Sequence, residues 1–253
     1  MLTPGAYARR GVRHHLALDL GTSTVRVWTP AGGAVVTEPA VIAPAPSGRH
    51  VVGHAALELE AAGGAKLIWP VRQGVVDNFF ACVHLLRIVS AAAGRPRDDV
   101  SPVLVGVPAT ATLRQKNLLV AAVRRATGGR VATVEEPLAA ALACRPNPGC
   151  GDVLAVDIGH GRTEVARITD GAVVAAERVD EVDPIDQLPA IADCVRRMGA
   201  GPLRSRRRLL ITGGGAACPG AATRLAALAG RTVTMPTEPH LATLTGLRLL
   251  LTG

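Results

Sequence analysis

The sequence predicts an α/β protein of two lobes with a ligand cleft between them, and three observations lead to this fold class. A segment occurs twice, because residues 16–27 read LALDLGTSTVRV and residues 154–165 read LAVDIGHGRTEV. Strand-like and helix-like patterns alternate along the chain. The 253 residues are 48% hydrophobic but only 2% aromatic, so the core is built from aliphatic side chains, which suits strands alternating with helices.

Each copy of the repeat reads as an apolar strand that ends in an aspartate, Asp19 or Asp157, followed by a glycine turn and a second β-rich run. The copies start more than half the chain length apart, so the repeat is a duplicated domain core rather than a short-period solenoid. Two such hairpins that face each other place two carboxylates and two sets of turn N–H groups around one cleft. That arrangement suits a phosphate chain with its magnesium ion.

In the first half, the patterns predict a hairpin, a third strand interrupted by Pro39, a Pro- and Gly-rich irregular stretch, and then strands alternating with helices. Pro137 is well placed to open the last of these helices. The predicted elements are the hairpin 15–20 and 24–29, the strand 35–42, the irregular stretch 44–70 with a short helix around 55–62, a helix after 71–79, the strand 103–108, the helix 111–127, the strand 131–137 and the helix after it.

The second half repeats this plan after a linker at 146–152, which is the predicted boundary between lobes. Its predicted elements are a hairpin over 153–179, a helix at 187–198, the strand 207–215 with a glycine turn, a helix from Pro219, a last strand, and a final helix with leucines at helical spacing. The expected organisation is therefore a flexible N-terminal segment 1–14, an N-terminal lobe 15–148 and a C-terminal lobe 149–253.

Charge and cysteine content narrow the function class. The net charge is +8 and nearly all basic residues are arginines, but they are scattered with few aromatics between them. A solvated basic surface is therefore favoured over attraction to nucleic acid, and no nucleic-acid partner is expected. The five cysteines are dispersed without CxxC spacing, so neither a disulfide framework nor a zinc site is indicated, and a cytoplasmic location is expected.

The turn after Asp19 is the first candidate for chemistry. Its glycine lets the backbone approach an anion, and the N–H and hydroxyl groups that follow could hold phosphate oxygens, with Asp19 contacting Mg²⁺ through water. An ordinary β-turn is the alternative. The residues of this candidate loop are Gly21, Thr22, Ser23 and Thr24.

The turn after Asp157 is the second candidate, with Gly159 and Gly161 forming another nest for phosphate. His160 either touches a phosphate there or is merely solvated.

Two further motifs follow strands. Glu136, in Glu-Glu-Pro before a helix, could orient a water toward a γ-phosphate, or could simply be an acid favoured at a helix start. A glycine run follows the strand at 209–211 and either attracts an anion at the next helix start or forms a tight structural turn. It is not a P-loop, because no Lys-Ser or Lys-Thr follows. Its residues are Gly213, Gly214, Gly215 and Ala216.

The order of these four motifs resembles that of the actin-like ATPase superfamily, and within it the MreB family of bacterial cell-shape proteins. The segments that carry the resemblance are LDLGTST (18–24), EPAVIA (38–43), PVRQGVVDNF (70–79), VLVGVPATAT (103–112), VEEPLAAALA (134–143), VDIGHGRTEVA (156–166), LLITGGGA (209–216) and TEPHLATLTGL (237–247). The resemblance implies an actin-like fold of two duplicated, ribonuclease H-like lobes with a nucleotide cleft. It also implies ATP and Mg²⁺ as cofactors and filament assembly near the inner membrane.

By this resemblance, Asp19 and Asp157 serve the metal, and the two hairpin turns serve the phosphates. The glycine run forms the adenosine turn. Glu136, Asp157 and Thr163 are the implied catalytic residues, with Glu136 positioning the hydrolytic water.

Three departures modify the expectation. The family's Gly-Gly-Gly-Thr-Thr after the second Asp-Ile pair is here Gly-His-Gly-Arg-Thr, so Arg162 stands where the first threonine is expected. An arginine there could stabilise phosphate charge or fill the pocket as a substitute cation, and slow or absent hydrolysis is expected. The family's small subdomain between Asp157 and Gly213 is missing, which predicts weakened ATP binding. The loop 94–101 is polar, so any contact with an anionic membrane would come from arginines and be weak and salt-sensitive.

The leading hypothesis is therefore a shortened MreB-like protein that self-assembles or co-assembles with a full-length relative, and is at most a weak Mg-dependent ATPase. The alternatives are a non-polymerising nucleotide-dependent regulator or chaperone-like ATPase, a small-molecule kinase, and a degenerate scaffold that no longer binds nucleotide.

Overall fold

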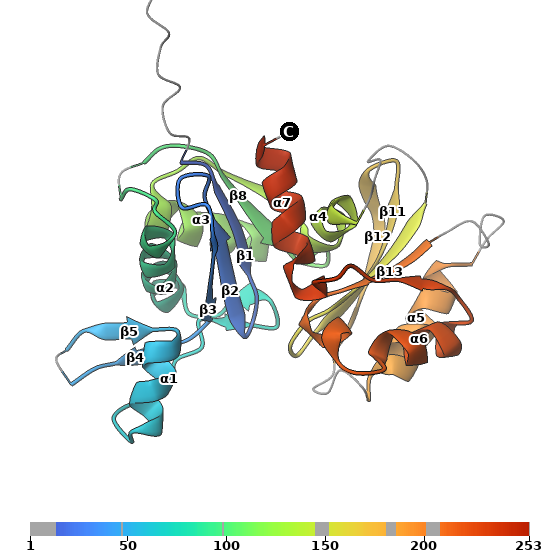
Figure 1. Ribbon diagram of the computed structural model, residues 1–253, viewed down its shortest axis with the longest axis horizontal. Coiled ribbons are helices and arrows are strands. Elements are labelled where there is room, and N and C mark those ends of the chain that lie inside the picture. The colour runs from blue at the N-terminus through green and yellow to red at the C-terminus, as the bar shows by residue number, and fades with distance from the viewer. Residues whose placement is uncertain are drawn as a thin grey trace, which may run out of the picture.

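The protein contains two five-stranded sheets with the same topology, seen side by side in Figure 1. We describe a computed structural model, which covers residues 14–46, 48–97, 99–144, 152–180, 186–200 and 208–252. In each sheet, three antiparallel strands continue into parallel ones, so the repeat seen in the sequence is a repeat of architecture.

The first sheet has the order β3-β2-β1-β8-β9, with β1 antiparallel to β2 and parallel to β8. Two helices of this half, α2 and α3, pack against one face. Its elements are β1 (Leu16–Leu20), β2 (Thr24–Trp28), β3 (Val35–Pro39), α2 (Phe79–Ala92), β8 (Val103–Val107), α3 (Leu113–Thr127) and β9 (Val131–Glu135). The predicted hairpin and the two later strands are confirmed, and the helix predicted at 111–127 begins at Leu113 behind the capping residue Thr112.

The second sheet has the order β12-β11-β10-β13-β14 and carries α5 and α6 on one face. Its elements are β10 (Val153–Ile158), β11 (Thr163–Thr169), β12 (Ala172–Val179), α5 (Leu188–Met198), β13 (Arg208–Thr212), η2 (Gly214–Ala217), α6 (Ala221–Ala229) and β14 (Val233–Thr234). The predicted hairpin at 153–179 is a three-stranded meander. Most of the predicted linker at 146–152, and nearly all of the N-terminal segment 1–14, lie outside the described residues.

Side chains alternate between the two faces of each central strand. In β1, Leu16, Leu18 and Leu20 belong to the core beneath α2 and α3. Ala17 belongs to a second core on the opposite face, so Asp19 also points to that face. The same alternation in β10 turns Asp157 toward the side opposite α5 and α6. The strand period therefore directs both aspartates to the space between the sheets.

Two helices fill that space and are exchanged between the halves. α7 (Ala242–Thr252) follows the second sheet but packs on the first, where Leu244 and Leu247 meet Ala17 and Trp28. α4 (Glu136–Ala143) follows the first sheet, and Ala141 packs on the second. The two helices also pack against each other, as Figure 1 shows between the sheets.

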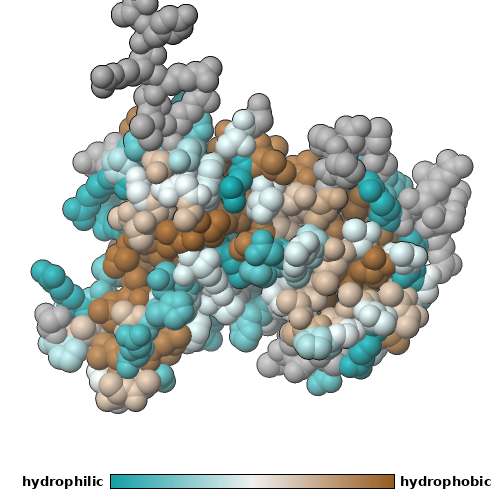
Figure 2. All heavy atoms as spheres, in the orientation of Figure 1, coloured by the Kyte–Doolittle hydropathy of each residue, from teal (hydrophilic) through white to brown (hydrophobic). Residues whose placement is uncertain are grey.

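A small unit projects from the first half where the sequence predicts irregular structure. It contains β4 (Ile42–Pro44), β5 (His50–Val52) and α1 (His54–Ala61), and β6 (Val71–Arg72) and β7 (Val75–Val76) follow it. The short helix is confirmed, but the prediction missed β5, because His50–Val52 is too short to show a period. Figure 2 shows this unit at lower left, with apolar atoms on it and on the adjoining part of the first half.

The second half has no room for a matching unit, since only residues 180–187 lie between β12 and α5. This interval lies between Asp157 and Gly213, the stretch in which the sequence predicts a missing subdomain. No helix among the described residues has the length and apolar character needed to cross a bilayer.

Candidate functional site

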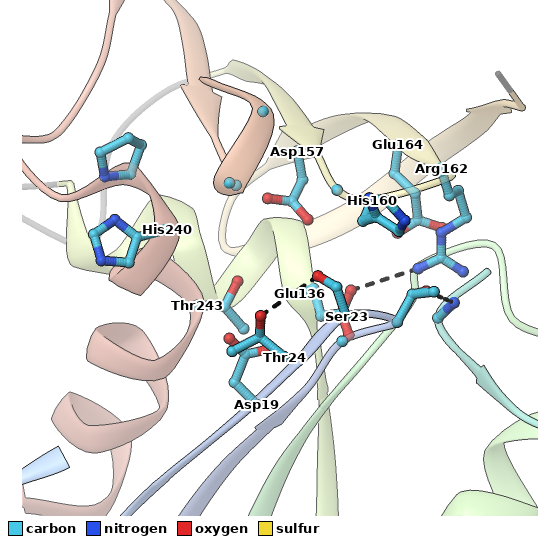
Figure 3. A pocket seen from close by; sticks show the side chains of 18 of the residues that line it. Asp19, Ser23, Thr24, Glu136, Asp157, His160, Arg162, Glu164, His240 and Thr243 are labelled. Atoms are coloured by element: carbon cyan, nitrogen blue, oxygen red, sulfur yellow. Dashed lines mark hydrogen bonds and ion pairs between the residues drawn. The ribbon is translucent and has the colours of Figure 1, made fainter. Parts of the chain in front are cut away.

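A cavity of about 320 Å³ lies between the two halves, where β1, β10 and β13 end and α4 and α7 begin. Figure 3 shows its side chains converging from both sheets, with Asp157 above and Asp19 below. The cavity is lined by all four sequence motifs, although they are far apart in the chain.

The turns that follow the two aspartates have the same geometry. The N–H of Gly21 donates to the carbonyl oxygen of Thr24 at 2.9 Å, and the N–H of Gly159 donates to that of Arg162 at 2.9 Å. A Cβ atom at Gly21 or Gly159 would lie 3.1 or 3.0 Å from the accepting oxygen, which leaves little room for a side chain. Both turns therefore begin with a glycine that has no side chain to shield the backbone, and the backbone N–H groups of such turns can bind an anion.

Asp19 is 8% exposed and lies opposite Arg26 in the β1–β2 register. Nη1 of Arg26 donates to Oδ2 of Asp19 at 3.2 Å. Burial raises the pKa of the Asp19 carboxyl above its usual value, and the charge of Arg26 opposes that rise. The first carboxylate thus already has a cation beside it.

Asp157 occupies the equivalent place in the second hairpin, but it lies opposite Glu164 rather than an arginine. Its Oδ1 accepts a hydrogen bond from Thr212 at 2.9 Å. The pKa of Asp157 is raised to about 6, chiefly by burial. The Thr212 hydrogen bond and the charge of Arg162 oppose this rise, whereas the charges of Asp19 and Glu164 add to it. Among the described residues no arginine forms an ion pair with this second carboxylate, although the charge of Arg162 lowers its pKa.

Glu136 begins α4 and is 8% exposed. Its Oε2 lies 3.5 Å from Nη2 of Arg162, an ion pair marked in Figure 3. Burial raises the pKa of Glu136 well above its ordinary value, and Arg162 opposes this rise. The nearby carboxylates Asp19, Asp157 and Glu164 act in the same direction as burial.

Arg162 also ties the second half to the first. Its Nη1 donates to the carbonyl oxygen of Gln73 at 2.7 Å, in the turn between β6 and β7. The next residue of that turn, Gly74, donates its N–H to Oγ1 of Thr22 at 2.8 Å. A Cβ at Gly74 would lie 2.5 Å from the Arg162 guanidinium, so the glycine makes space for this side chain.

Glu164 makes a second tie between the halves. Its carboxylate accepts from the N–H groups of Ala109 and Thr110 at 2.8 and 3.0 Å, and from the Thr110 hydroxyl. These groups belong to the loop between β8 and α3. The hydrogen bonds of Glu164 therefore hold this loop and are not directed at a ligand.

Most of the sequence-predicted site residues line the cavity. Those present beside Asp19, Glu136 and Asp157 are Gly21, Thr22, Ser23, Thr24, Gly159, His160, Gly213, Gly214 and Gly215. Three predicted residues do not line it. Thr163 is fully buried and donates to Gln187, and Ala216 is 2% exposed. An added Cβ at Gly161, the third, would meet no atom within 4 Å. Strand alternation explains Thr163, because its neighbours Arg162 and Glu164 face the cavity.

Several cavity residues were not anticipated from the sequence, namely Arg26, Gly74, Glu164, Cys218, Pro239, His240 and Thr243. Arg26 and Glu164 could have been found by pairing each hairpin outward from its turn, since they stand opposite the aspartates. Pro239 is held at the cavity by a hydrogen bond, because its carbonyl oxygen accepts from the N–H of Gly213 at 2.9 Å. Gly213 has φ +89°, a conformation that favours glycine.

Taken together, the cavity offers two backbone turns, hydroxyls and a glycine run that suit an anionic chain, beside carboxylates that require cations. The sequence model described as MreB/Mbl protein matches residues 13–197, about three quarters of the chain. The chain belongs to the MreB/Mbl family.

The curated MreB/Mbl relatives include the cell shape-determining protein MreB of Escherichia coli (strain K12), which is 32% identical over 178 residues. That match covers 65% of this chain and 50% of the relative. Mbl of Bacillus subtilis (strain 168) is 26% identical over 179 residues, covering 65% of this chain and 51% of the relative. The matched region thus spans about half the length of these MreB/Mbl proteins.

Solved structures show that the MreB/Mbl chain has the fold of actin-like ATPases. MreB5 of Spiroplasma citri, bound to AMPPNP, has a TM-score of 0.82 at 17% identity, covering 94% of this chain and 96% of that one. A MamK double helical filament has a TM-score of 0.75 at 18% identity, covering 94% and 99%. The predicted fold class is confirmed.

Proposed function

We propose that this MreB/Mbl chain binds ATP in the cleft and assembles, alone or with a full-length MreB-like protein, into filaments that serve bacterial cell shape. One observation carries the proposal: two geometrically matching glycine turns, after Asp19 and Asp157, face each other across one cavity. Such a pair suits a chain of phosphates, since turn N–H groups form anion-binding concavities. The AMPPNP- and ADP-bound states of the structurally similar MreB5 support the same ligand class.

The adenosine part of the ligand is assigned to the glycine run. Gly213, Gly214 and Gly215 line the cavity beside His240. No Cβ neighbour crowds Gly214 within 4 Å, so a flat ring could approach this backbone. Without a counterpart of the β4–β5–α1 unit in the second half, the base has fewer walls around it. We expect ATP binding that is weaker than in relatives that have such a subdomain.

From the family resemblance we expect a magnesium ion with the nucleotide, held by Asp19 and Asp157. The side chains present fit this ion only in part. Asp157 retains an oxygen for a bound water, whereas Asp19 is engaged by Arg26. Among the described residues, no three His, Cys, Asp or Glu side chains form a group that could hold a metal.

Hydrolysis is expected to be slow or absent. Glu136, the residue proposed to position the attacking water, is held by Arg162 at 3.5 Å. Thr163 points into the second lobe and donates to Gln187, away from the cavity. A general base must reach the water that it activates, and both groups are committed elsewhere.

A peripheral position at the inner face of the membrane would depend on few side chains of the loop before β8. In the loop before β8, Arg95 is 4% exposed and donates to backbone carbonyl groups, including those of His14 and Ser101. Arg95 therefore cannot reach a lipid headgroup. Any contact through this loop would depend on Arg97, which is exposed, and would be weak.

The proposal is tested in two steps. Thermal unfolding with and without Mg-ATP measures binding, because a ligand of the native state raises the midpoint. Sedimentation and negative-stain microscopy, with and without ATP and with a full-length MreB-like protein, measure assembly. A midpoint that ATP leaves unchanged would support the degenerate scaffold. A shifted midpoint with a monomer under all conditions would support the non-polymerising regulator.

A further inference from the structure

The cleft contains two guanidinium groups, one from each duplicated hairpin. Arg26 comes from β2 and Arg162 from the turn before β11, and both line the cavity. Each stands beside a carboxylate that the resemblance assigns to magnesium or to the hydrolytic water. The two cations therefore occupy functional positions rather than the outer surface.

Arg26 neutralises the first carboxylate. Its side chain is 16% exposed and that of Asp19 is 11% exposed, with 3.2 Å between Nη1 and Oδ2. The register fixes this pair, because Asp19 and Arg26 are directly opposite in the hairpin. Nε of Arg26 is buried and has no hydrogen-bond partner among the described residues, so an oxygen in the cavity would be met by the terminal nitrogens of this guanidinium.

Arg162 stands in the other half of the cleft. Its side chain is 7% exposed, close to Glu136 at 10%, and the carbonyl oxygen of Gln73 holds one of its nitrogens. Arg162 thus belongs to the second lobe, but its side chain is held in place by residues of the first lobe. A planar guanidinium can serve several oxygens at once, including those of a phosphate.

Three of the four acidic side chains in the cleft are paired with an arginine or with backbone N–H groups, and the fourth, Asp157, accepts a hydrogen bond from Thr212. Of the four acidic side chains, Glu164 is satisfied by the Ala109 and Thr110 N–H groups. Asp19 and Glu136 each have an arginine. The two guanidinium groups together carry the formal charge of one divalent cation.

We propose that Arg26 and Arg162 replace the divalent cation of this site, so that the phosphate chain of a nucleotide binds without Mg²⁺. This inference rests on the proposed nucleotide function. It concerns only how the negative charge of the phosphates is balanced, since side chains fixed in the fold supply the positive charge.

The test is isothermal titration calorimetry of the full chain with ATP, once in excess EDTA and once in excess MgCl₂. We expect the two dissociation constants to agree within about threefold, because the cations are part of the protein. Binding that is present in MgCl₂ and lost in EDTA overturns the inference. Absence of binding in both solutions overturns the nucleotide site itself, and would mean that the arginines fill it.

A double variant, Arg26→Leu with Arg162→Thr, tests the residues directly. In EDTA it should bind ATP roughly tenfold or more weakly, since two charge-assisted contacts are lost. MgCl₂ should restore part of that loss in the variant. Arg124→Ala is the matched control, because Arg124 is an exposed arginine on α3 outside the cavity. Unchanged affinity of the double variant in EDTA would overturn the role of the arginines.

Discussion

Gly246 of α7 lies against the carbonyl oxygen of Ala139 in α4, so close that a Cβ on the glycine would overlap that oxygen. This contact sits where the two exchanged helices cross, and it sets how closely the two halves of the cleft approach. Small residues at helix crossings let backbones come together, and the neighbouring Ala140 and Ala141 continue the pattern.

Gly246→Ala should destabilise the protein, although alanine is the better helix former by about 1 kcal/mol. The added methyl overpacks the crossing, so we expect a net loss of about 1–3 kcal/mol in the free energy of unfolding. Urea denaturation measures it. Leu249→Ala, at a half-exposed position of the same helix, should change stability by less than about 1 kcal/mol. A Gly246→Ala protein as stable as the wild type would show that the helices can separate.

Glu164→Gln should loosen the tie between the second hairpin and the β8–α3 loop. The variant loses charge-assisted hydrogen bonds from Ala109 and Thr110, which predicts a loss of about 1–3 kcal/mol in the free energy of unfolding. Glu60→Gln, on the exposed face of α1, is the control with the same change of charge. Equal stability of the two variants in denaturant titrations would count against the tie.

Stability of the unliganded protein should fall as the pH rises through 6. The pKa of Asp157 is about 6 in the folded protein against 3.8 as its ordinary value. A carboxyl whose pKa is raised by folding stabilises the protein below its ordinary pKa, and that stabilisation is lost as pH passes the folded value. The loss is on the order of 3 kcal/mol, and Asp19 and Glu136 shift in the same direction.

Asp157→Asn should flatten this decline, as followed by urea unfolding on either side of pH 6. Asp170→Asn serves as the control, because Asp170 is exposed in a turn at φ +51°, a conformation that asparagine tolerates. An unchanged pH profile in Asp157→Asn would assign the decline to other carboxyls.

Arg95→Ala should be strongly destabilising, in contrast to Arg97→Ala in the same loop. The Arg95 guanidinium is buried and donates to the carbonyl oxygens of Thr127, His14, Asp99 and Ser101. Its removal leaves these acceptors without a donor, at a cost of about 3 kcal/mol or more. Arg97 is exposed, so its loss should be nearly neutral to thermal unfolding.

The repeat in the sequence predicted the architecture well, because a strand, an aspartate and a glycine turn leave a local signature. The two hairpins and most residues of the cavity follow from that signature. Arg26 and Glu164 were missed for a different reason. Their importance depends on strand pairing, which places them opposite Asp19 and Asp157, and a motif read along the chain does not show what lies across it.

Thr163 shows that a family motif can also assign a residue to the site that the fold turns away from it. The family motif assigns it to the cleft, but alternation along β11 turns it toward Gln187, while its two neighbours take the inward positions. The partners of Arg162 could not be predicted either, since Gln73 lies in another lobe and is brought near only by the fold.

The exchange of α4 and α7 has a consequence for biosynthesis. When a ribosome has finished β9, the first sheet has all of its strands, but Ala17 and Trp28 still lack the leucines of α7 that cover them. Arg248, which stacks 4.7 Å from the Trp28 ring, is also still to be added. The nascent first half therefore exposes an apolar face throughout translation of the second, and its folding is completed only when α7 has left the exit tunnel.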